Sequence, residues 1–272
     1  PHQTVRHVHV AGTKGKGSTC EMTAAALEAC GYCVGLYTSP HLVDIRERIR
    51  LNRKNISESD FARLLKVVAD AAAQVYAVHG DATFFELTTA LGFLYFAEQA
   101  VDLAVIEVGL GGKLDCTNVI SPEVAAVALI GYDHTQILGS TLEEIAAQKG
   151  GIFKPGAPAL TYDQNPAVLK VLRQCAESVG STLLVVGKDL EFSWRGETTR
   201  QGPGVRCTFT SERNNFEHIH VPLKGEHQAQ NCGLALAILD QLSARGFACP
   251  APKVTRGIES ATLPGRFEVL PT

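Results

Sequence analysis

The sequence predicts an α/β fold, in which a mostly parallel sheet is flanked by helices and carries a small antiparallel β attachment. Short apolar runs of strand length alternate along the chain with longer stretches whose apolar residues recur at helical spacing. A strand, a helix and a second strand in that order require a crossover, and crossovers produce parallel neighbours. Residues 190–222 depart from this alternation, because short β-like runs joined by polar turns replace it there. This segment is the predicted attachment.

Each expected strand is a run of four to eight residues rich in aliphatic and β-branched side chains. One of them, Leu103–Val108, is almost continuously apolar, as expected for a strand that is buried on both faces. The strands expected in the main sheet are Val5–Val10, Cys33–Tyr37, Leu103–Val108, Glu123–Ile130, Ala159–Tyr162 and Thr182–Val186. In the attachment, the β-like runs are Cys207–Thr210 and His218–Val221.

The helices expected between the strands repeat apolar residues every three to four positions. The first of them, Thr19–Ala29, is also rich in alanine, which has the highest helix propensity. The expected helices are Thr19–Ala29, Phe61–Val78, Phe84–Gln99, Leu142–Lys149, Val168–Val179 and Glu226–Leu242.

Composition excludes several classes of protein. A chain of 272 residues that is 45% hydrophobic and 19% charged can bury a large core, which excludes disorder, collagen and coiled coil. The net charge of −3 gives no basic field that would attract nucleic acid or an anionic membrane. No apolar stretch approaches the roughly 20 residues of a membrane span. The eight scattered cysteines are typical of reduced thiols in a cytosolic protein.

A glycine-rich turn, Gly12–Thr19, joins the first expected strand to the first expected helix. Glycines let backbone N–H groups converge on one point, a helix N-terminus adds partial positive charge, and a lysine adds a full charge. The common nucleotide-triphosphate pattern places lysine directly after the last glycine, whereas Lys16 here precedes Gly17. The alternative is a turn that binds nothing, but the lysines and hydroxyls among the glycines favour a phosphate-binding loop.

Three further strand ends carry polar side chains. Ser39 follows the second expected strand, Glu107 lies near the end of the apolar strand, and His134 follows Glu123–Ile130. Ligands of parallel sheets collect outside the carboxyl ends of the strands, so we expect these side chains beside a bound polyphosphate. A hydroxyl, a carboxylate and an imidazole there suit a divalent cation that bridges phosphate oxygens, and Mg²⁺ is the cation expected.

These three residues also have alternatives without a ligand. Ser39 alone is as well explained as a turn hydroxyl, and His134 alone as a loop histidine with one hydrogen bond. Glu107 is the hardest to explain in this way, because burying an unpaired carboxylate costs several kcal/mol.

The motifs at these positions resemble those of folylpolyglutamate synthase and dihydrofolate synthase, the folate branch of the Mur ligase family. They run in the family's order over nearly the whole chain. They are Ala11–Ser18, Leu36–Leu42, Glu107–Gly112, Asp115–Asn118, Asp133–Thr135, Gly225–Gln228 with Asn231, and Pro264–Phe267. The resemblance implies a phosphate-loop domain like the central domain of Mur ligases, and hence the ATP-binding domain of a ligase.

The resemblance also implies a reaction and the residues that serve it. ATP phosphorylates a carboxylate of folate or dihydropteroate, and the amine of L-glutamate then displaces the phosphate to form an amide. The implied ATP-binding residues are Gly15, Lys16, Gly17, Ser18, Thr19, Asn231 and Arg266. The implied ligands of Mg²⁺ are Ser39, Glu107 and His134, and the implied catalytic residues are Lys149, Lys16 and His134. ATP and Mg²⁺ are therefore the expected cofactors.

Two of these assignments have alternatives. The segment Glu144–Lys149 resembles the one that carries the family's carbamylated lysine, but Lys149 would also fit as a plain lysine at a helix C-terminus. The implied pterin-binding residues are Thr83, Phe84, Phe85, Glu86, Leu114, Asp115 and Cys116. Phe84 and Phe85 would equally fit the core of their helix.

Family members begin some tens of residues earlier and continue into a Rossmann-like domain that binds glutamate, and we expect both parts to be absent from this sequence. Residues 1–272 are expected to form a single ATP-binding ligase domain, monomeric and cytoplasmic, with residues 190–222 inside it. Two other functions stay open: a Mur-type ligase for a peptidoglycan precursor, and a nucleotide-binding fragment without turnover. The order and length of the motifs at residues 36–42 and 107–118 favour folate.

Four other patterns have a structural explanation as well as a functional one. Cys30–Cys33 has redox spacing but no second pair for zinc, which favours a structural role. His218–His220 is either a two-histidine metal site or, more simply, an exposed strand face. His7 and His9 are expected in the core or at its edge. Arg46–Arg53 belongs by resemblance to a mobile loop near the substrate, with a solvated loop as the alternative.

Overall fold

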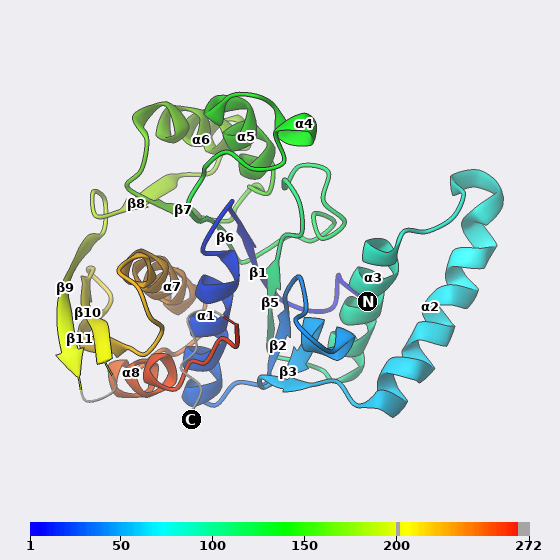
Figure 1. Ribbon diagram of the computed structural model, residues 1–272, viewed down its shortest axis with the longest axis horizontal. Coiled ribbons are helices and arrows are strands. Elements are labelled where there is room, and N and C mark those ends of the chain that lie inside the picture. Colours follow the sequence, from blue (N-terminus) through cyan, green and yellow to red (C-terminus); the bar gives the residue numbers. More distant parts are fainter. Residues whose placement is uncertain (200–201, 266–272) are drawn as a thin grey trace.

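The computed structural model describes residues 1–199 and 202–265, and its centre is an eight-stranded sheet in the order β4-β3-β2-β5-β1-β6-β7-β8 (Figure 1). Neighbours from β2 through β8 are parallel, whereas β3 and β4 add to one edge in antiparallel pairs. The strands are β1 (His7–Ala11), β2 (Val34–Tyr37), β3 (Ile49–Leu51), β4 (Lys54–Asn55), β5 (Leu103–Glu107), β6 (Val124–Val127), β7 (Ala159–Tyr162) and β8 (Leu183–Val186). The predicted, mostly parallel α/β sheet is confirmed.

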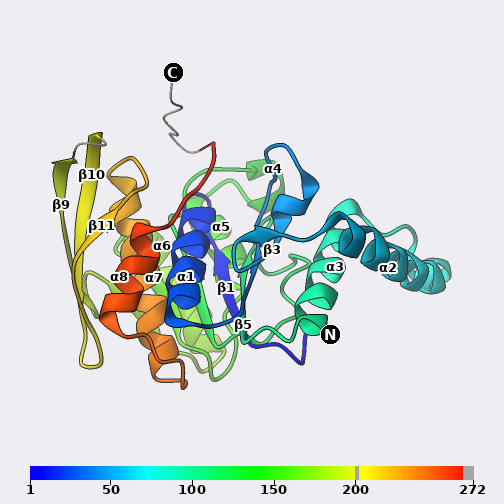
Figure 2. The same cartoon turned by 90° about the horizontal axis from the view of Figure 1, so that it is seen from below.

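Helices cover both faces of this sheet (Figures 1 and 2). One face packs against α1 (Lys16–Cys30), α7 (His227–Ser243) and α8 (Ala251–Glu259). The other face packs against α5 (Leu142–Gly150) and α6 (Pro166–Ser178) at one end. At the other end it packs against α2 (Glu58–His79) and α3 (Phe84–Glu98). The short helices are η1 (Ile45–Arg48) and α4 (Thr135–Leu138).

The period-two alternation of a strand explains why both layers are needed. Val8 and Val10 of β1 belong to the apolar cluster beneath α1 and α7, and so do alternate residues of β6. Ala125 and Val127, the other two residues of β6, belong to the cluster beneath α5 and α6. Since both faces of these central strands are buried, neither face is left to solvent.

The predicted antiparallel attachment is a three-stranded sheet of β9 (Glu191–Thr199), β10 (Gly202–Thr210) and β11 (Asn215–Val221). Its inner face buries Cys207, Phe209, Phe216 and Ile219 in the same apolar cluster as α7 and α8. The strands are longer than the β-like runs of the sequence, because charged residues on their outer face interrupt the apolar pattern without ending the pairing.

Helix α8 and the segment around β3 are among the parts of the fold that differ from the prediction. Helix α8, which begins with Ala251 and Pro252, is absent from the expected elements although its Val254 and Ile258 are fully buried. Arg46–Arg53 contains the end of η1 and all of β3 rather than a solvated loop. That alternative is wrong, because ion pairs with α1 and the pairing of β3 with β2 bury this charged segment.

The carboxyl ends of β1, β2, β5 and β6 lie along one edge of the sheet. Strands β5 and β6 flank β1 on opposite sides. The carboxyl end of β1 is therefore a topological switch point, where the connections to the neighbouring strands run in opposite directions. Open α/β sheets bind ligands at such a point. Among the described residues, no helix has both the length and the apolar character that crossing a membrane requires.

Candidate active site

The glycine-rich turn forms a tight loop between β1 and α1. Gly12 and Gly15 have φ values of 151° and 86°, a region that side chains strain to adopt. The backbone N–H groups of Thr13 and Lys14 both donate to the carbonyl of Leu129, which ties the loop to the segment after β6. Because α1 begins at Lys16, the loop places that lysine and the free N–H groups of the first helical turn together.

A cavity of about 710 Å³ opens directly over this loop. It brings together the loop, the ends of β2 and β5, the start of α4 and the start of α7. The site candidates that line it are Gly15, Lys16, Gly17, Ser18, Ser39, Glu107, His134 and Asn231. Thr19 is buried inside α1 and does not line the cavity, and Arg266 lies outside the described residues.

Glu107 is the last residue of β5, and its carboxylate is held at the floor of the cavity with only 5% of the residue exposed. Its Oε2 accepts the backbone N–H of Ser39 at 3.0 Å. A Cβ placed on Gly17 would lie 3.6 Å from the same oxygen, so any longer side chain there would fill the space between the carboxylate and the loop. Gly17 therefore keeps open a space between the Glu107 carboxylate, Ser39 and the glycine-rich loop.

The geometry around Glu107 fits a hard cation that is shared with a phosphate. No group of three or more His, Cys, Asp or Glu side chains in residues 1–199 and 202–265 could hold a metal ion. Mg²⁺ needs no such cluster, because it takes few protein ligands and completes its shell with water and phosphate oxygens. Ser39, Glu107 and His134 all border the cavity, where the first two offer the oxygen ligands that Mg²⁺ prefers and His134 offers a nitrogen.

His134 reaches the cavity through an unusual backbone conformation. It precedes α4 with a φ of 48°, and its Nε2 lies 3.7 Å from Oδ1 of Asp133. Asp133 in turn lies 3.7 Å from Nζ of Lys14 in the phosphate loop. These side chains are substantially exposed, so their contacts with one another are weak.

Lys149 lies behind the loop rather than in the cavity. Only 4% of the residue is exposed, and its Nζ donates to the carbonyl of Gly12 at 2.9 Å. Burial, reinforced by the charge of Lys16, lowers the pKa of Lys149 from 10.5 to about 8. The amine is therefore partly neutral near physiological pH, unlike a solvated lysine at the end of a helix.

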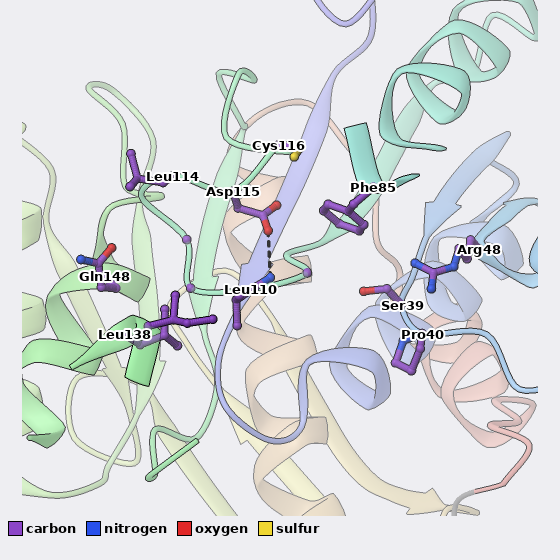
Figure 3. A pocket seen from close by; sticks show the side chains of 14 residues that line it. Ser39, Pro40, Arg48, Phe85, Leu110, Leu114, Asp115, Cys116, Leu138 and Gln148 are labelled. Atoms are coloured by element: carbon purple, nitrogen blue, oxygen red, sulfur yellow. Dashed lines mark hydrogen bonds between the residues drawn. The ribbon is translucent and has the colours of Figure 1, made fainter. Parts of the chain in front are cut away.

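A second cavity, of about 570 Å³, adjoins the first (Figure 3). Its walls are mostly apolar and come from the 109–116 segment, α3, α4 and α5. The residues that line it are Ser39, Pro40, Arg48, Phe85, Gly109, Leu110, Gly111, Gly112, Leu114, Asp115, Cys116, Ile137, Leu138 and Gln148. Ser39, Pro40 and Gly109 also line the first cavity, so the two spaces share one wall.

Four of the predicted pterin-binding residues line this second cavity: Phe85, Leu114, Asp115 and Cys116. The other three begin α3 and do not line it. Thr83 and Glu86 form a capping box, in which each side chain accepts a backbone N–H of the other residue. Phe84 is half exposed, so neither of its two sequence-based explanations, the core or the cavity, describes its position.

Arg48 is a lining residue that composition and motifs did not single out. It is only 8% exposed, its Nε lies 2.8 Å from Nδ1 of His41, and its guanidinium lies over the ring of Phe84. The loop before it is fixed by Glu47, whose carboxylate accepts the N–H groups of Leu42, Val43 and Asp44. Arg48 thus brings a positive charge to the wall of this mostly apolar cavity.

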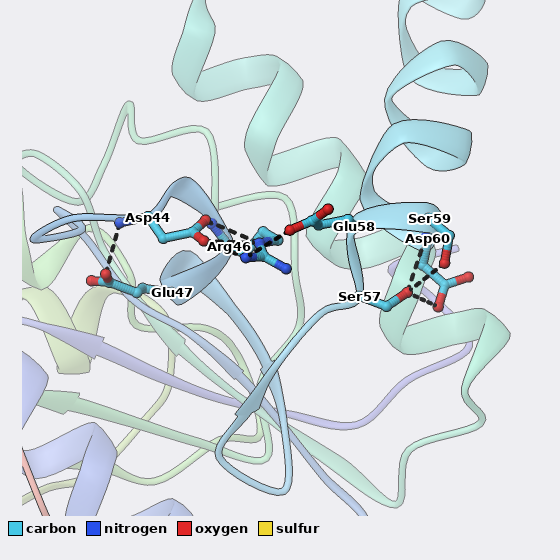
Figure 4. Close-up of polar contacts among 7 residues, drawn as sticks. All are labelled: Asp44, Arg46, Glu47, Ser57, Glu58, Ser59 and Asp60. Atoms are coloured by element: carbon cyan, nitrogen blue, oxygen red, sulfur yellow. Dashed lines mark hydrogen bonds and ion pairs between the residues drawn. The ribbon is translucent and has the colours of Figure 1, made fainter.

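Arg46, two residues away, faces elsewhere. It forms ion pairs with Asp44 and with Glu58 at the start of α2 (Figure 4). It lines neither cavity. Two arginines of one short segment therefore have different roles: Arg48 lines the cavity, whereas Arg46 holds the loop and α2 together. The sequence alone does not distinguish them, because both lie in the same run of charged residues.

The remaining patterns have structural explanations. His7 and His9 are buried in β1, where burial lowers the pKa of His7 to about 4 and that of His9 to about 3. His220 is paired with Glu197, which also binds Arg206, so no two-histidine site forms with His218. All eight cysteines are free thiols.

Comparison with known proteins shows the family of this chain. The family model "Mur ligase middle domain" matches residues 10–239. The chain is 37% identical over 275 residues to the dihydrofolate synthase/folylpolyglutamate synthase of Bacillus subtilis, an alignment that covers 99% of this chain and 63% of that relative. This chain thus spans less than two thirds of that protein's length.

Solved structures agree as well. The apo form of L. casei FPGS superposes with a TM-score of 0.92 at 33% identity, covering 98% of this chain and 65% of that one. An FPGS complex with AMPPCP and folate gives the same TM-score and identity, with the same coverage of both chains. The chain therefore belongs to the Mur ligase middle domain family, in the branch of the folylpolyglutamate and dihydrofolate synthases.

Proposed function

We propose that this chain is the ATP-binding part of a ligase that joins L-glutamate to a carboxylate of folate or dihydropteroate. The observation that carries the proposal is the wall of Ser39, Pro40 and Gly109 shared by the polar and the apolar cavity. A substrate whose flat ring system occupies the apolar cavity can extend its carboxylate past this wall to the terminal phosphate of ATP. The FPGS complex with AMPPCP and folate supports this pairing of ligands.

The first step is phosphoryl transfer. A carboxylate oxygen attacks the γ-phosphorus, the bond to the β-bridging oxygen breaks, and ADP leaves with the electron pair. Lys16 and the N–H groups at the start of α1 would stabilise the charge on the phosphates. Mg²⁺ held by Ser39, Glu107 and His134 would neutralise part of the same charge.

The second step is amide formation. The neutral amine of glutamate attacks the acyl carbon, inorganic phosphate leaves, and the nitrogen loses a proton. An acyl phosphate hydrolyses readily, so this step requires exclusion of water and a positioned amine. The described residues offer no site that we can assign to glutamate. We therefore propose that the 272-residue chain binds nucleotide and pteroyl substrate but does not complete the reaction.

Arg48 adds a positive charge to the cavity in which the ring system is proposed to lie. A buried guanidinium in a mostly apolar cavity favours an anionic ligand, and carboxylates are the preferred partners of arginine. Phe85, Leu110 and Leu114 offer apolar surface to a ring system. This combination supports an aromatic acid as the substrate and gives less support to a peptidoglycan precursor. The free thiols support a reducing compartment such as the cytosol.

Titration calorimetry with MgATP and with folate, together with ADP release in the presence of dihydropteroate and glutamate, tests the proposal. We expect both ligands to bind, and the replacement Arg48→Met to weaken folate binding by about tenfold or more while MgATP binding is unchanged. Arg46→Met is the matched control and should leave both affinities unchanged. Failure of the wild-type chain to bind folate would contradict the proposed substrate. Glutamate-dependent ADP release by the 272-residue chain would contradict the proposed lack of turnover.

A further inference from the structure

A buried chain of hydrogen bonds leads from β1 to the wall of the apolar cavity. Nε2 of His9 lies 2.8 Å from Oγ1 of Thr117, and that hydroxyl donates to Oδ1 of Asp115 at 2.5 Å. His9 and Thr117 are fully buried, and Asp115 is about nine-tenths buried where it lines the cavity. None of the steps proposed above uses His9 or Thr117.

The direction of this chain follows from counting protons. A threonine hydroxyl has one proton, and here the Asp115 carboxylate accepts it. Oγ1 of Thr117 must therefore accept from His9, which places the ring proton on Nε2 and leaves Nδ1 bare. Nδ1 of His9 is buried without a hydrogen-bond partner, so a charged ring would bury an unpaired N–H there. Burial keeps the ring neutral by lowering the pKa of His9 to about 3.

Asp115 uses both carboxylate oxygens to shape the cavity. Its Oδ2 accepts the backbone N–H of Leu110 at 2.8 Å (Figure 3). Its Oδ1 accepts the backbone N–H of Thr117 at 3.0 Å. The carboxylate therefore fastens the 109–111 turn, which contributes Gly109 to the wall shared with the ATP cavity, to the 115–117 segment. Rotation of this carboxylate would release the turn at Leu110.

We propose that His9 is a positioning residue for the apolar cavity, fixing the Asp115 carboxylate through the hydroxyl of Thr117. The imidazole does not touch the cavity and takes no part in the reaction. By donating to Oγ1 of Thr117, it directs the hydroxyl proton of Thr117 toward Asp115. That hydrogen bond orients the Asp115 carboxylate, which holds the 109–111 turn. The inference rests on the proposed function only for the identity of the ligand used in the binding test.

The first test is independent of any ligand. Nitrogen NMR of ¹⁵N-histidine-labelled protein should show His9 protonated at Nε2 and not at Nδ1. Thr117→Val keeps the size of the side chain but removes the hydroxyl, and should raise hydrogen exchange at the Leu110 amide about tenfold or more. Thr117→Ser, which retains the hydroxyl, should restore slow exchange. Protonation at Nδ1 in the wild-type protein, or unchanged exchange in Thr117→Val, would overturn the proposal.

The second test asks whether the positioning matters for binding. Thr117→Val and His9→Met should each raise the Kd for folate about tenfold, with little further loss in the double variant and MgATP affinity within about twofold of wild type. Thr161→Val is the matched control, since Thr161 is fully buried and donates its hydroxyl to the carbonyl of Val127. It should lower stability but leave folate affinity unchanged.

The outcomes separate the two proposals. Equal losses of folate affinity in Thr117→Val and Thr161→Val would indicate general destabilisation and contradict the role of His9. Failure of the wild-type protein to bind folate would contradict the proposed substrate. The NMR and exchange measurements would still decide whether the His9–Thr117–Asp115 chain holds the 109–111 turn.

Discussion

At the scale of single residues, the most informative side chain is a cation that the protein buries. Lys149 donates to the carbonyl of Gly12 from beneath the phosphate loop, and its pKa of about 8 leaves about half of the amine neutral at pH 8. A solvated lysine with a pKa of 10.5 would be neutral in only about 0.3% of molecules at that pH. Since CO₂ reacts with neutral amines, Lys149 has the chemical property that carbamylation requires.

We predict that Lys149 forms a carbamate. The signal of a ¹³C-labelled carbamate should grow as the pH rises from 7 through 8 at fixed CO₂ pressure, because the folded-state pKa lies in that window. It should vanish in Lys149→Arg. Lys154→Arg is the control, because Lys154 is also partly buried and donates to the carbonyl of Asn118. A carbamate signal that survives in Lys149→Arg would assign the modification to another group.

Some site residues were predictable from the sequence and others were not. Glu107 stands out because a carboxylate at the end of an apolar strand is costly unless it serves a ligand. Arg48 gives no such signal, since it lies in a segment of mixed charge that resembles a solvated loop. Its burial depends on β3 adding to β2 and on contacts with His41 and Phe84, which only the folded chain brings together.

At the scale of elements, the start of α1 shows how backbone geometry builds the site. Gly15 has a φ of 86°, and a Cβ there would overlap Oδ1 of Asn231 on α7. The loop therefore approaches α7 closely only because position 15 has no side chain. This contact joins two elements that lie far apart in the sequence but line the same cavity.

Gly15→Ala is predicted to weaken MgATP binding about tenfold or more, because either the loop or Asn231 must move out of the cavity wall. An alanine at a positive φ also strains the backbone, and this effect must be separated from the loss of the contact with Asn231. Gly156→Ala is the matched control, with a φ of 77° and nothing within 4 Å of the added Cβ. Calorimetry should show normal MgATP affinity in Gly156→Ala, with a loss of stability of about 1 kcal/mol. Equal affinities in the two variants would contradict the role of the contact.

The sequence predicted elements best where they are apolar and regular. Strands such as Leu103–Val108 are recognisable because both faces are buried, and α1 because it is alanine-rich. Helix α8 was missed since only two of its residues carry buried aliphatic side chains, Val254 and Ile258, within a polar stretch. Strands β3 and β4 were missed because a strand of two or three residues has too few positions to show alternation.

At the scale of the whole molecule, the small antiparallel sheet shares its core with the main sheet. Phe209 and Phe216 belong to the same apolar cluster as Val8 of β1 and the buried residues of α7. A polar anchor adds to this contact: Asp240 of α7 is fully buried and accepts hydrogen bonds from Ser211 and Asn214 in the β10–β11 turn. Continuous packing of this kind favours unfolding as one cooperative unit.

We predict that Asp240→Ala lowers the free energy of unfolding by about 3 kcal/mol, because it leaves Arg213 and the turn without their buried partner. Asp163→Ala, at an exposed pair with Lys188, should change it by less than about 0.5 kcal/mol. The single tryptophan, Trp194 on β9, reports on the small sheet, whereas far-UV circular dichroism reports on the whole chain. The two signals should show coincident urea transitions in wild type and in Asp240→Ala. An earlier fluorescence transition would show that the small sheet unfolds alone, and residues 190–222 would then have to be described as a separate unit.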